Sequence, residues 1–208
     1  MAIGVYIFVV VVSYVLGSTP SGYLAGMVRG IDIRTVGSGN IGATNVFRVL
    51  GRTAGIAVLI ADGLKGFVAA RFVPALALHI FTASGARREG LSLAAGVGAI
   101  LGHNYSCWLR FKGGKGIATS GGVVMAWAPQ ACLTALGVWG VVILITRYVS
   151  LASIAAAVTL PFAVWLWKGS PTMTYVMSAL SLLAIYKHKG NIQRLLKGTE
   201  NRIGKKKN

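Results

Sequence analysis

The sequence predicts an all-α polytopic membrane helix bundle, and three observations lead to this fold class. Of 208 residues, 55% are hydrophobic and only 12% are charged, and the mean hydropathy is +0.69. These values lie outside the range of soluble domains. Long apolar runs alternate with short polar segments, and the basic residues gather in those segments. We therefore expect a single integral membrane domain over residues 1–208, with no soluble domain beside it.

The apolar runs define the expected helices in order along the chain. They lie near residues 2–26, 54–84, 91–106, 117–147, 151–167 and 172–187. A helix needs about 20 apolar residues to cross the hydrocarbon core. The first run has no basic residues before it, which favours a retained span over a cleaved signal peptide. Pro74 and Pro129 interrupt the two longest runs, so each of these is either a single span or a hairpin.

The distribution of basic residues bears on the topology. If 54–84 crosses once and 117–147 crosses twice, the chain has seven transmembrane helices, its N-terminus outside and its C-terminus in the cytoplasm. Basic residues then divide 16 inside to 3 outside, as the positive-inside bias requires. The reverse assignment also gives seven spans and divides them 15 to 5, so charge alone does not decide. We prefer the first because it gathers the polar motifs on one face.

Three polar motifs interrupt the apolar sequence. They are residues 37–51 (GSGNIGATNVFRVLG), 102–119 (GHNYSCWLRFKGGKGIAT) and 187–202 (KHKGNIQRLLKGTENR). Segments rich in glycine, amide side chains and fixed positive charge suit the binding of phosphate, which accepts hydrogen bonds from Arg, Lys and backbone N–H groups. The net charge of +17 follows from membrane topology, so we expect no nucleic-acid partner.

The motifs contain the candidate anion-binding groups. Arg48 and Lys115 offer charge, and glycines let backbone N–H groups approach an oxyanion. Short side chains that hydrogen-bond at close range are Ser38, Asn40, Thr44 and Asn45. The alternative is that these are ordinary loops in which Ser38 or Asn45 merely caps the next helix. Three such motifs in one chain favour a functional site.

Catalytic groups are scarce, with four acidic residues and three histidines. None of the acids is in an evident position to orient a histidine, and His103 has Cys107 four residues on, where a His-x4-Asp acyltransferase has aspartate. His188 is the better candidate, since Asn191 follows one helical turn later. Asp62 and Lys65, three residues apart, are expected to neutralise one another.

Other residues are expected to have structural roles. Cys107 and Cys132 have no paired spacing, and we expect no metal site and no cofactor. The spacing of Gly98 and Gly102 predicts close packing of helices.

These motifs resemble the bacterial acyl-phosphate:glycerol-3-phosphate acyltransferase family of multi-span membrane enzymes. The segments that carry the resemblance are DIRTVGSGNIGATNVFRVLG, DGLKG, GHNYSCWLRFKGGKGIAT and HKGNIQRLLKGTENRIGKK, in the expected order. Two departures are visible. The family usually has proline where Ser106 stands, and often glutamate where Gly190 stands.

The resemblance implies transfer of a fatty acyl group from acyl phosphate to the 1-hydroxyl of glycerol 3-phosphate, giving lysophosphatidic acid and phosphate. It implies a bacterial inner-membrane enzyme whose motifs face the cytoplasm among membrane lipids, supplied by a soluble enzyme that makes acyl phosphate. The residues it marks are Ser38, Arg48, Lys115, His188 and Asn191, with Gly113, Gly114 and Gly116 shaping the glycerol phosphate pocket and Ser153 at the same face.

An acyl phosphate is a mixed anhydride with a good leaving group, so positioning and charge neutralisation can carry most of the catalysis. We expect direct attack by the hydroxyl without an acyl-enzyme, with His188 or the substrate's own phosphate accepting the proton. The alternative is an anion or phospholipid transporter. A transporter should carry ionisable residues near the bilayer midplane, whereas here nearly all charge lies at span ends, with His79 the main exception.

Overall fold

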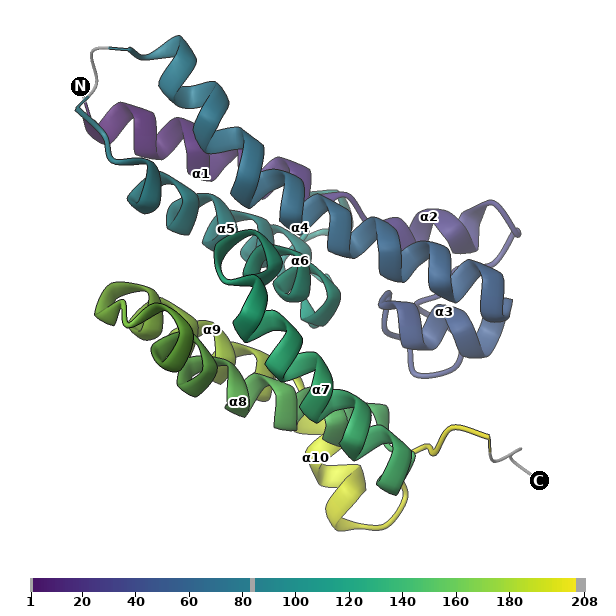
Figure 1. Ribbon diagram of the computed structural model, residues 1–208. Coiled ribbons are helices and arrows are strands. Elements are labelled where there is room, and N and C mark those ends of the chain that lie inside the picture. Colours follow the sequence, from purple (N-terminus) through teal and green to yellow (C-terminus); the bar gives the residue numbers. More distant parts are fainter. Residues whose placement is uncertain (1, 83–84, 205–208) are drawn as a thin grey trace. The chain divides into compact units, whose positions relative to one another are not determined.

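A computed structural model describes residues 2–82 and 85–204, and within these ranges the chain is helical, with no strand (Figure 1). The chain divides into two compact units, Met1–Trp127 and Ala128–Asn208. Ala128, with φ −150° and ψ 78°, lies outside the α region and separates two helices, because a residue that precedes proline is disfavoured in the α region. The apolar run 117–147 therefore forms two helices.

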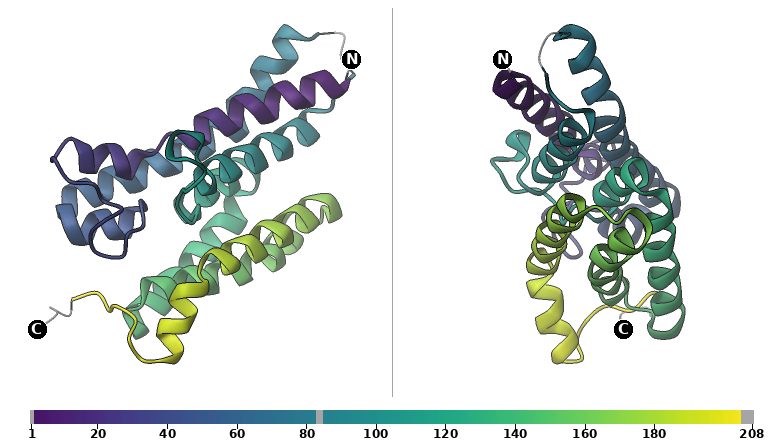
Figure 2. Two further views of the ribbon diagram at one scale, coloured as in Figure 1. Left: turned by 180° about the vertical axis from the view of Figure 1, so that it is seen from behind. Right: turned by 60° about the vertical axis from the view of Figure 1, so that its left-hand side comes forward.

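In the N-terminal unit, one long helix contacts all the others (Figures 1 and 2). This helix is α4, and the helices around it are α1, α2, α3, α5 and α6. Their bounds are α1 Ala2–Ser18, α2 Ser21–Met27, α3 Ala43–Leu50, α4 Arg52–Ile80, α5 Arg88–Asn104 and α6 Ile117–Trp127. Helix α4 continues through Pro74, so 54–84 holds a single helix. The run 2–26 is instead broken at Thr19 and Pro20, because proline lacks the N–H that would continue the helix.

Close packing of α1 on α5 depends on small residues. A Cβ on Gly98 would lie 2.8 Å from the carbonyl oxygen of Val10, and one on Gly102 would collide with that of Tyr14. The prediction of close helix packing at Gly98 and Gly102 is confirmed. This contact fixes the C-terminal end of α5, from which the second polar motif begins.

The C-terminal unit is built around α8, which contacts the other three helices. The bounds are α7 Pro129–Thr146, α8 Val149–Lys168, α9 Pro171–Lys187 and α10 Lys189–Leu196. Arg147 ends α7 in the left-handed conformation, with φ 61°. The segment after α10 returns to this turn, where the N–H of Ile203 donates to the Arg147 carbonyl at 2.9 Å. The lysines at 205–207, counted in the basic tail, lie outside the described residues.

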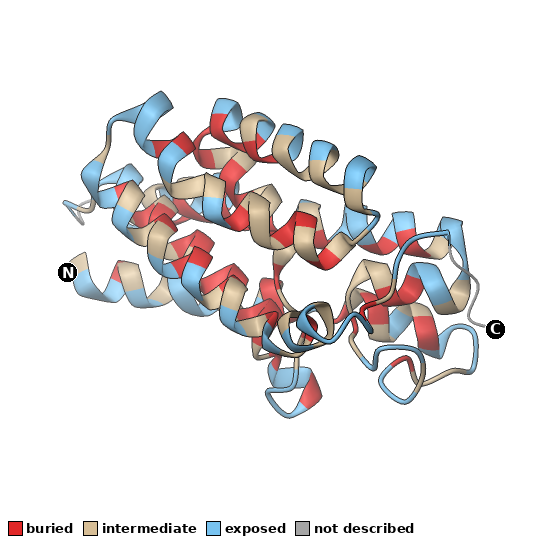
Figure 3. Ribbon diagram, turned by 90° about the horizontal axis from the view of Figure 1, so that it is seen from below, coloured by how far each residue is buried: buried red, intermediate tan, exposed pale blue. Residues whose placement is uncertain are grey.

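Much apolar surface faces outward from the helices. Leu144, Leu166 and Ile3 are 80%, 74% and 76% exposed, and in Figure 3 buried residues lie where helices of a unit face one another. Three segments are long and apolar enough to cross a membrane: Ala2–Met27, Pro129–Thr146 and Val149–Lys168. Helix α6 has 11 residues and is therefore about 16 Å long, roughly half the hydrocarbon thickness.

Candidate active site

The loop of the first motif is organised by the side chain of Asn45. Its Oδ1 accepts the Ser38 N–H at 2.8 Å, and its Nδ2 donates to the carbonyls of Ile33 and Val36, each at 3.1 Å. Asn45 is only 2% exposed. Because its amide makes three hydrogen bonds within the loop, Asn45 holds the backbone in shape.

The other candidates of this motif lie nearer the surface. Ser38 and Arg48 are exposed, and Thr44 is half-buried in the first turn of α3. Asn40 Oδ1 accepts the N–H of Gly42 at 2.8 Å, which closes a tight turn. Gly42 is the residue that precedes α3, and no side chain caps the helix. Ser38 and Asn45 therefore do not cap α3.

The first and second motifs come together within the N-terminal unit. Leu109, in the short 3-10 helix Cys107–Leu109, packs in one buried cluster with Ile33, Ile41, Val46 and Val58. Apolar contacts between the two segments place α3, which carries Arg48, and the loop that carries Lys115 at the same end of this unit.

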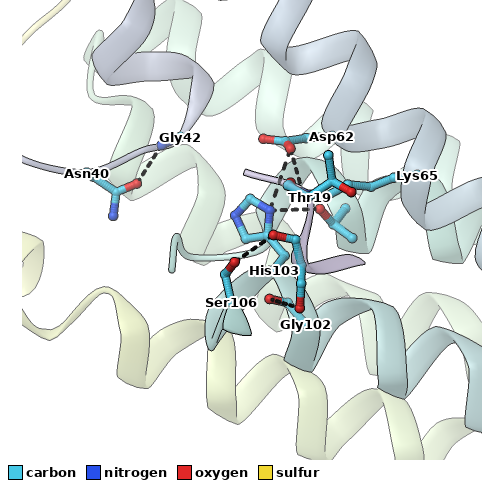
Figure 4. A network of polar contacts seen from close by, with 10 residues as sticks. Thr19, Asn40, Gly42, Asp62, Lys65, Gly102, His103 and Ser106 are labelled. Carbon is cyan, nitrogen blue, oxygen red and sulfur yellow. Dashed lines mark hydrogen bonds and ion pairs between the residues drawn. The ribbon is translucent and has the colours of Figure 1, made fainter. Parts of the chain in front are cut away.

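Hydrogen bonds to the C-terminal part of α1 hold the beginning of the second motif. Ser106 Oγ donates to the Ser18 carbonyl at 2.6 Å (Figure 4). The Tyr14 hydroxyl donates to the Tyr105 carbonyl at 2.6 Å. The buried Ser106 hydroxyl therefore helps to fix this loop.

The glycine-rich loop KGGKG lies directly on the end of α5. The N–H of Gly113 donates to the Asn104 carbonyl at 3.3 Å, and that of Gly114 to the His103 carbonyl at 3.0 Å. These bonds satisfy carbonyls that a helix C-terminus leaves without partners. We expected glycine amides to face an oxyanion, but these two amides already donate within the protein. Lys115, between Gly114 and Gly116, is half-buried.

A buried group of ionisable residues lies beneath this loop (Figure 4). Lys65 Nζ lies 2.8 Å from Asp62 Oδ1, which confirms the expected pair. Asp62 also lies 3.6 Å from His103 Nδ1, so an acidic residue does stand beside a histidine, contrary to our sequence reading. The two residues come from different helices, and the only sequence signal was that each belongs to a motif segment.

In the C-terminal unit, His188 lies at the junction of α9 and α10. Its Nδ1 is 2.8 Å from the Ala184 carbonyl oxygen, and the residue is 3% exposed. A carbonyl oxygen only accepts, so Nδ1 carries the proton and Nε2 is the acceptor nitrogen of the neutral ring. This tautomer suits a proton acceptor.

Glu200 orients Asn191 and was missed by sequence reasoning. The carboxylate accepts hydrogen bonds from Asn191 Nδ2 at 2.8 Å, Ser150 Oγ at 3.0 Å and Arg194 Nε at 2.7 Å. Burial raises the pKa of Glu200, but these hydrogen bonds and the charge of Arg194 together hold it below its ordinary value.

The Ser153 hydroxyl makes two hydrogen bonds within the C-terminal unit. It donates to the Val149 carbonyl at 2.8 Å and accepts from Trp139 Nε1 at 3.4 Å. Among the described residues, no three His, Cys, Asp or Glu side chains come together as metal ligands.

Comparison with known proteins places the chain in a family. A family model described as glycerol-3-phosphate acyltransferase matches residues 7–198. The chain belongs to the glycerol-3-phosphate acyltransferase family. A relative with this name from Desulforudis audaxviator is 48% identical, covering 97% of each chain, and one from Geotalea daltonii is 44% identical, covering 94% of this chain and 96% of the relative.

The fold has a close counterpart among solved structures of this family. The crystal structure of PlsY, an integral membrane glycerol 3-phosphate acyltransferase, in its glycerol 3-phosphate form has a TM-score of 0.85 and 39% identity, covering 96% of each chain. The lysophosphatidic acid form has a TM-score of 0.83 and 38% identity, covering 96% of this chain and 95% of the other. Our chain is accordingly an all-α integral membrane protein.

Proposed function

We propose that this chain is a glycerol-3-phosphate acyltransferase that takes its acyl group from acyl phosphate. The 1-hydroxyl oxygen of glycerol 3-phosphate bonds to the acyl carbon, the bond from that carbon to the phosphate oxygen breaks, and lysophosphatidic acid and phosphate are released. The proposal includes no acyl-enzyme and no cofactor.

One observation carries the proposal most strongly. The segments that bear Ser38 and Arg48 and the segment that bears Lys115 share one buried apolar cluster through Leu109, so their polar residues belong to one end of one unit. Two phosphorylated substrates require several cationic and amide groups, which these segments provide. The names of the relatives agree with this substrate.

The residues divide into roles that follow from their chemistry. Arg48 and Lys115 neutralise phosphate charge as it develops on the leaving group. Ser38, Asn40, Thr44 and Asn191 offer hydrogen bonds to the substrates. Gly113, Gly114 and Gly116 shape the glycerol phosphate pocket, and Ser153 is a further substrate-binding residue. Asn45 contributes by holding the first loop in shape. His188 accepts the hydroxyl proton at Nε2, or the substrate's own phosphate does.

The proposed setting is the bacterial inner membrane, with seven spans, the N-terminus outside and the C-terminus and site in the cytoplasm. All three motifs serve the reaction, so residues 1–208 act as one domain, supplied with acyl phosphate by a soluble enzyme. Helix α6 is the fourth of the seven proposed spans, and it is the shortest of them. Whether it crosses the membrane therefore decides the topology. Accessibility labelling should place cysteines substituted at Lys115 and Gln130 on opposite sides, in a background where Cys107 and Cys132 are replaced; the same side would refute this topology.

The test of function uses purified protein in detergent. Phosphate should be released only when acyl phosphate and glycerol 3-phosphate are both present, and lysophosphatidic acid should appear in equal amount. Lys115→Met should lower kcat/KM by at least about a hundredfold, on the scale of an electrostatic group lost from a reaction centre. Lys112→Met is the matched control, since Lys112 is an exposed lysine of the same loop, and should keep most activity.

Other outcomes would reject specific parts of the proposal. Full turnover by Lys115→Met with normal binding would remove the electrostatic role. A trapped acyl-serine or acyl-cysteine adduct would replace direct transfer by a covalent intermediate. Phosphate flux across proteoliposomes without turnover would support the transporter.

A further inference from the structure

The buried ionisable cluster of the N-terminal unit has no part in the proposed chemistry. Asp62, Lys65 and His103 are 2%, 7% and 4% exposed. Lys65 is held by Asp62 and by the Thr19 carbonyl, to which its Nζ donates at 2.7 Å. Charges taken out of water are costly unless they are paired and hydrogen-bonded. Lys65 satisfies that condition, and the Asp62 carboxylate is paired with it by charge. Apolar residues would pack this space without the cost of burying charge, so we infer that the cluster has a role beyond packing.

His103 has two different neighbours on its two sides. Its Nδ1 faces Asp62 Oδ1 at 3.6 Å and Thr119 Oγ1 at 3.2 Å (Figure 4). On the other side, a Cβ placed on Gly114 would collide with His103 Nε2. The imidazole therefore stands between the buried cluster and the glycine-rich loop, with the loop resting on its edge.

The adjacent backbone and Asn104 complete this support. Gly113 and Gly114 donate to the carbonyls of Asn104 and His103, and a Cβ on Gly116 would lie 2.6 Å from Asn104 Oδ1. Three glycines of KGGKG thus lie against two consecutive residues of α5. This close approach requires glycine, because a side chain at any of these three positions would push the loop away from the helix.

We propose that Asp62 and Thr119 are positioning residues that fix the His103 ring, and that the ring sets the position of the 112–116 loop and hence of Lys115. The proposal rests on the proposed function, in which this loop binds substrate phosphate. A site supported from rigid helices is placed more accurately than one supported by loops alone. Here α4 supplies Asp62, α5 supplies His103 and α6 supplies Thr119.

A double-mutant cycle tests the contact between ring and loop. Gly114→Ala and His103→Ala should each raise the KM for glycerol 3-phosphate by about tenfold. The double variant should rise by about tenfold as well, not a hundredfold, because removing the ring makes room for the new methyl group.

Gly113→Ala is the matched control for this cycle. A Cβ there would collide with the backbone carbonyl of His103, which His103→Ala retains. The increases in KM caused by Gly113→Ala and by His103→Ala should therefore multiply in the double variant. If the Gly113 and Gly114 cycles are both multiplicative, or if neither is, the proposal is wrong.

A milder pair of variants separates positioning from general stability. Thr119→Val removes the hydroxyl that faces His103 Nδ1 but keeps the side-chain shape, and should raise the KM for glycerol 3-phosphate about threefold, with kcat and the thermal midpoint nearly unchanged. Thr119→Ser keeps the hydroxyl, so its KM for glycerol 3-phosphate should equal that of the wild type. If Thr119→Val lowers the thermal midpoint and kcat but leaves KM unchanged, the residue is structural only and the proposal is wrong.

The thermal midpoints of both cycles provide a readout that needs no activity. If the wild-type protein does not acylate glycerol 3-phosphate, the proposed function fails. In that case the thermal midpoints still test the support of the loop. If His103→Ala raises the midpoint of Gly114→Ala but not that of Gly113→Ala, the ring supports the loop. If it raises neither or both, the ring does not.

Discussion

Replacing Glu200 by glutamine should strongly destabilise the C-terminal unit. The carboxylate is 3% exposed and accepts three side-chain hydrogen bonds, from Ser150, Asn191 and Arg194. A glutamine amide can accept from two of these donors, but its NH₂ would then face the Arg194 guanidinium. A hydrogen bond to a charged group contributes about 1.5–3 kcal/mol, compared with about 1 kcal/mol for a neutral one.

The net loss is limited because Arg194 is 41% exposed, so water compensates part of the lost ion pair. We estimate a decrease of about 2–3 kcal/mol in the free energy of unfolding. For a chain of this size that lowers the thermal midpoint by roughly 5–10 °C. The assay is thermal unfolding of the purified protein in detergent. Glu89→Gln is the control, because Glu89 is an exposed carboxylate at the start of α5.

The pH dependence gives a second test of the same interaction. The pKa of Glu200 is lowered in the folded protein from its ordinary value of 4.5. A carboxylate with a lowered pKa stabilises the fold fully above its unfolded pKa and loses this contribution as the pH falls through the folded value. The difference in midpoint between wild type and Glu200→Gln should therefore be largest at neutral pH and shrink below pH 4.5. A difference that is constant from pH 7 to strongly acidic pH would refute the reasoning.

Two further predictions follow from individual contacts. Asn45→Ala leaves two carbonyls and one N–H of the loop without their partner. It should therefore lower the free energy of unfolding by about 1–3 kcal/mol and raise the KM for glycerol 3-phosphate. An unchanged thermal midpoint and KM would contradict the role of Asn45 in holding the loop. Gly190→Ala should stabilise α10 by about 0.5–1 kcal/mol, measured as a higher midpoint, since a Cβ there meets only Arg194 Nη1 at 3.6 Å; a lower midpoint would show that the site does not tolerate a side chain.

Local features of the sequence predicted the long apolar helices. Apolar runs predict helices because an apolar segment in lipid must satisfy its own backbone hydrogen bonds. The break at Pro129 and the pairing of Asp62 with Lys65 also depend only on neighbouring residues. The break at Thr19 and Pro20 was missed, although its cause is equally local.

The supports of the candidate site depended on contacts between distant segments. Asp62 meets His103 only because α4 packs on α5, and no periodicity relates residues on different helices. Glu200 reaches Asn191 because the chain returns after α10.

Composition and short-range pattern by themselves determined that this chain is a membrane helix bundle with cationic, glycine-rich loops, and the motif segments identified its family. Only the tertiary structure decided which groups the loops rest on. It turned the amides of Gly113 and Gly114 inward to α5 and committed Asn45 to its own loop. The physical reason is that a hydrogen-bonding group is available to a ligand only if packing has not already given it a partner, and packing joins residues that the sequence separates.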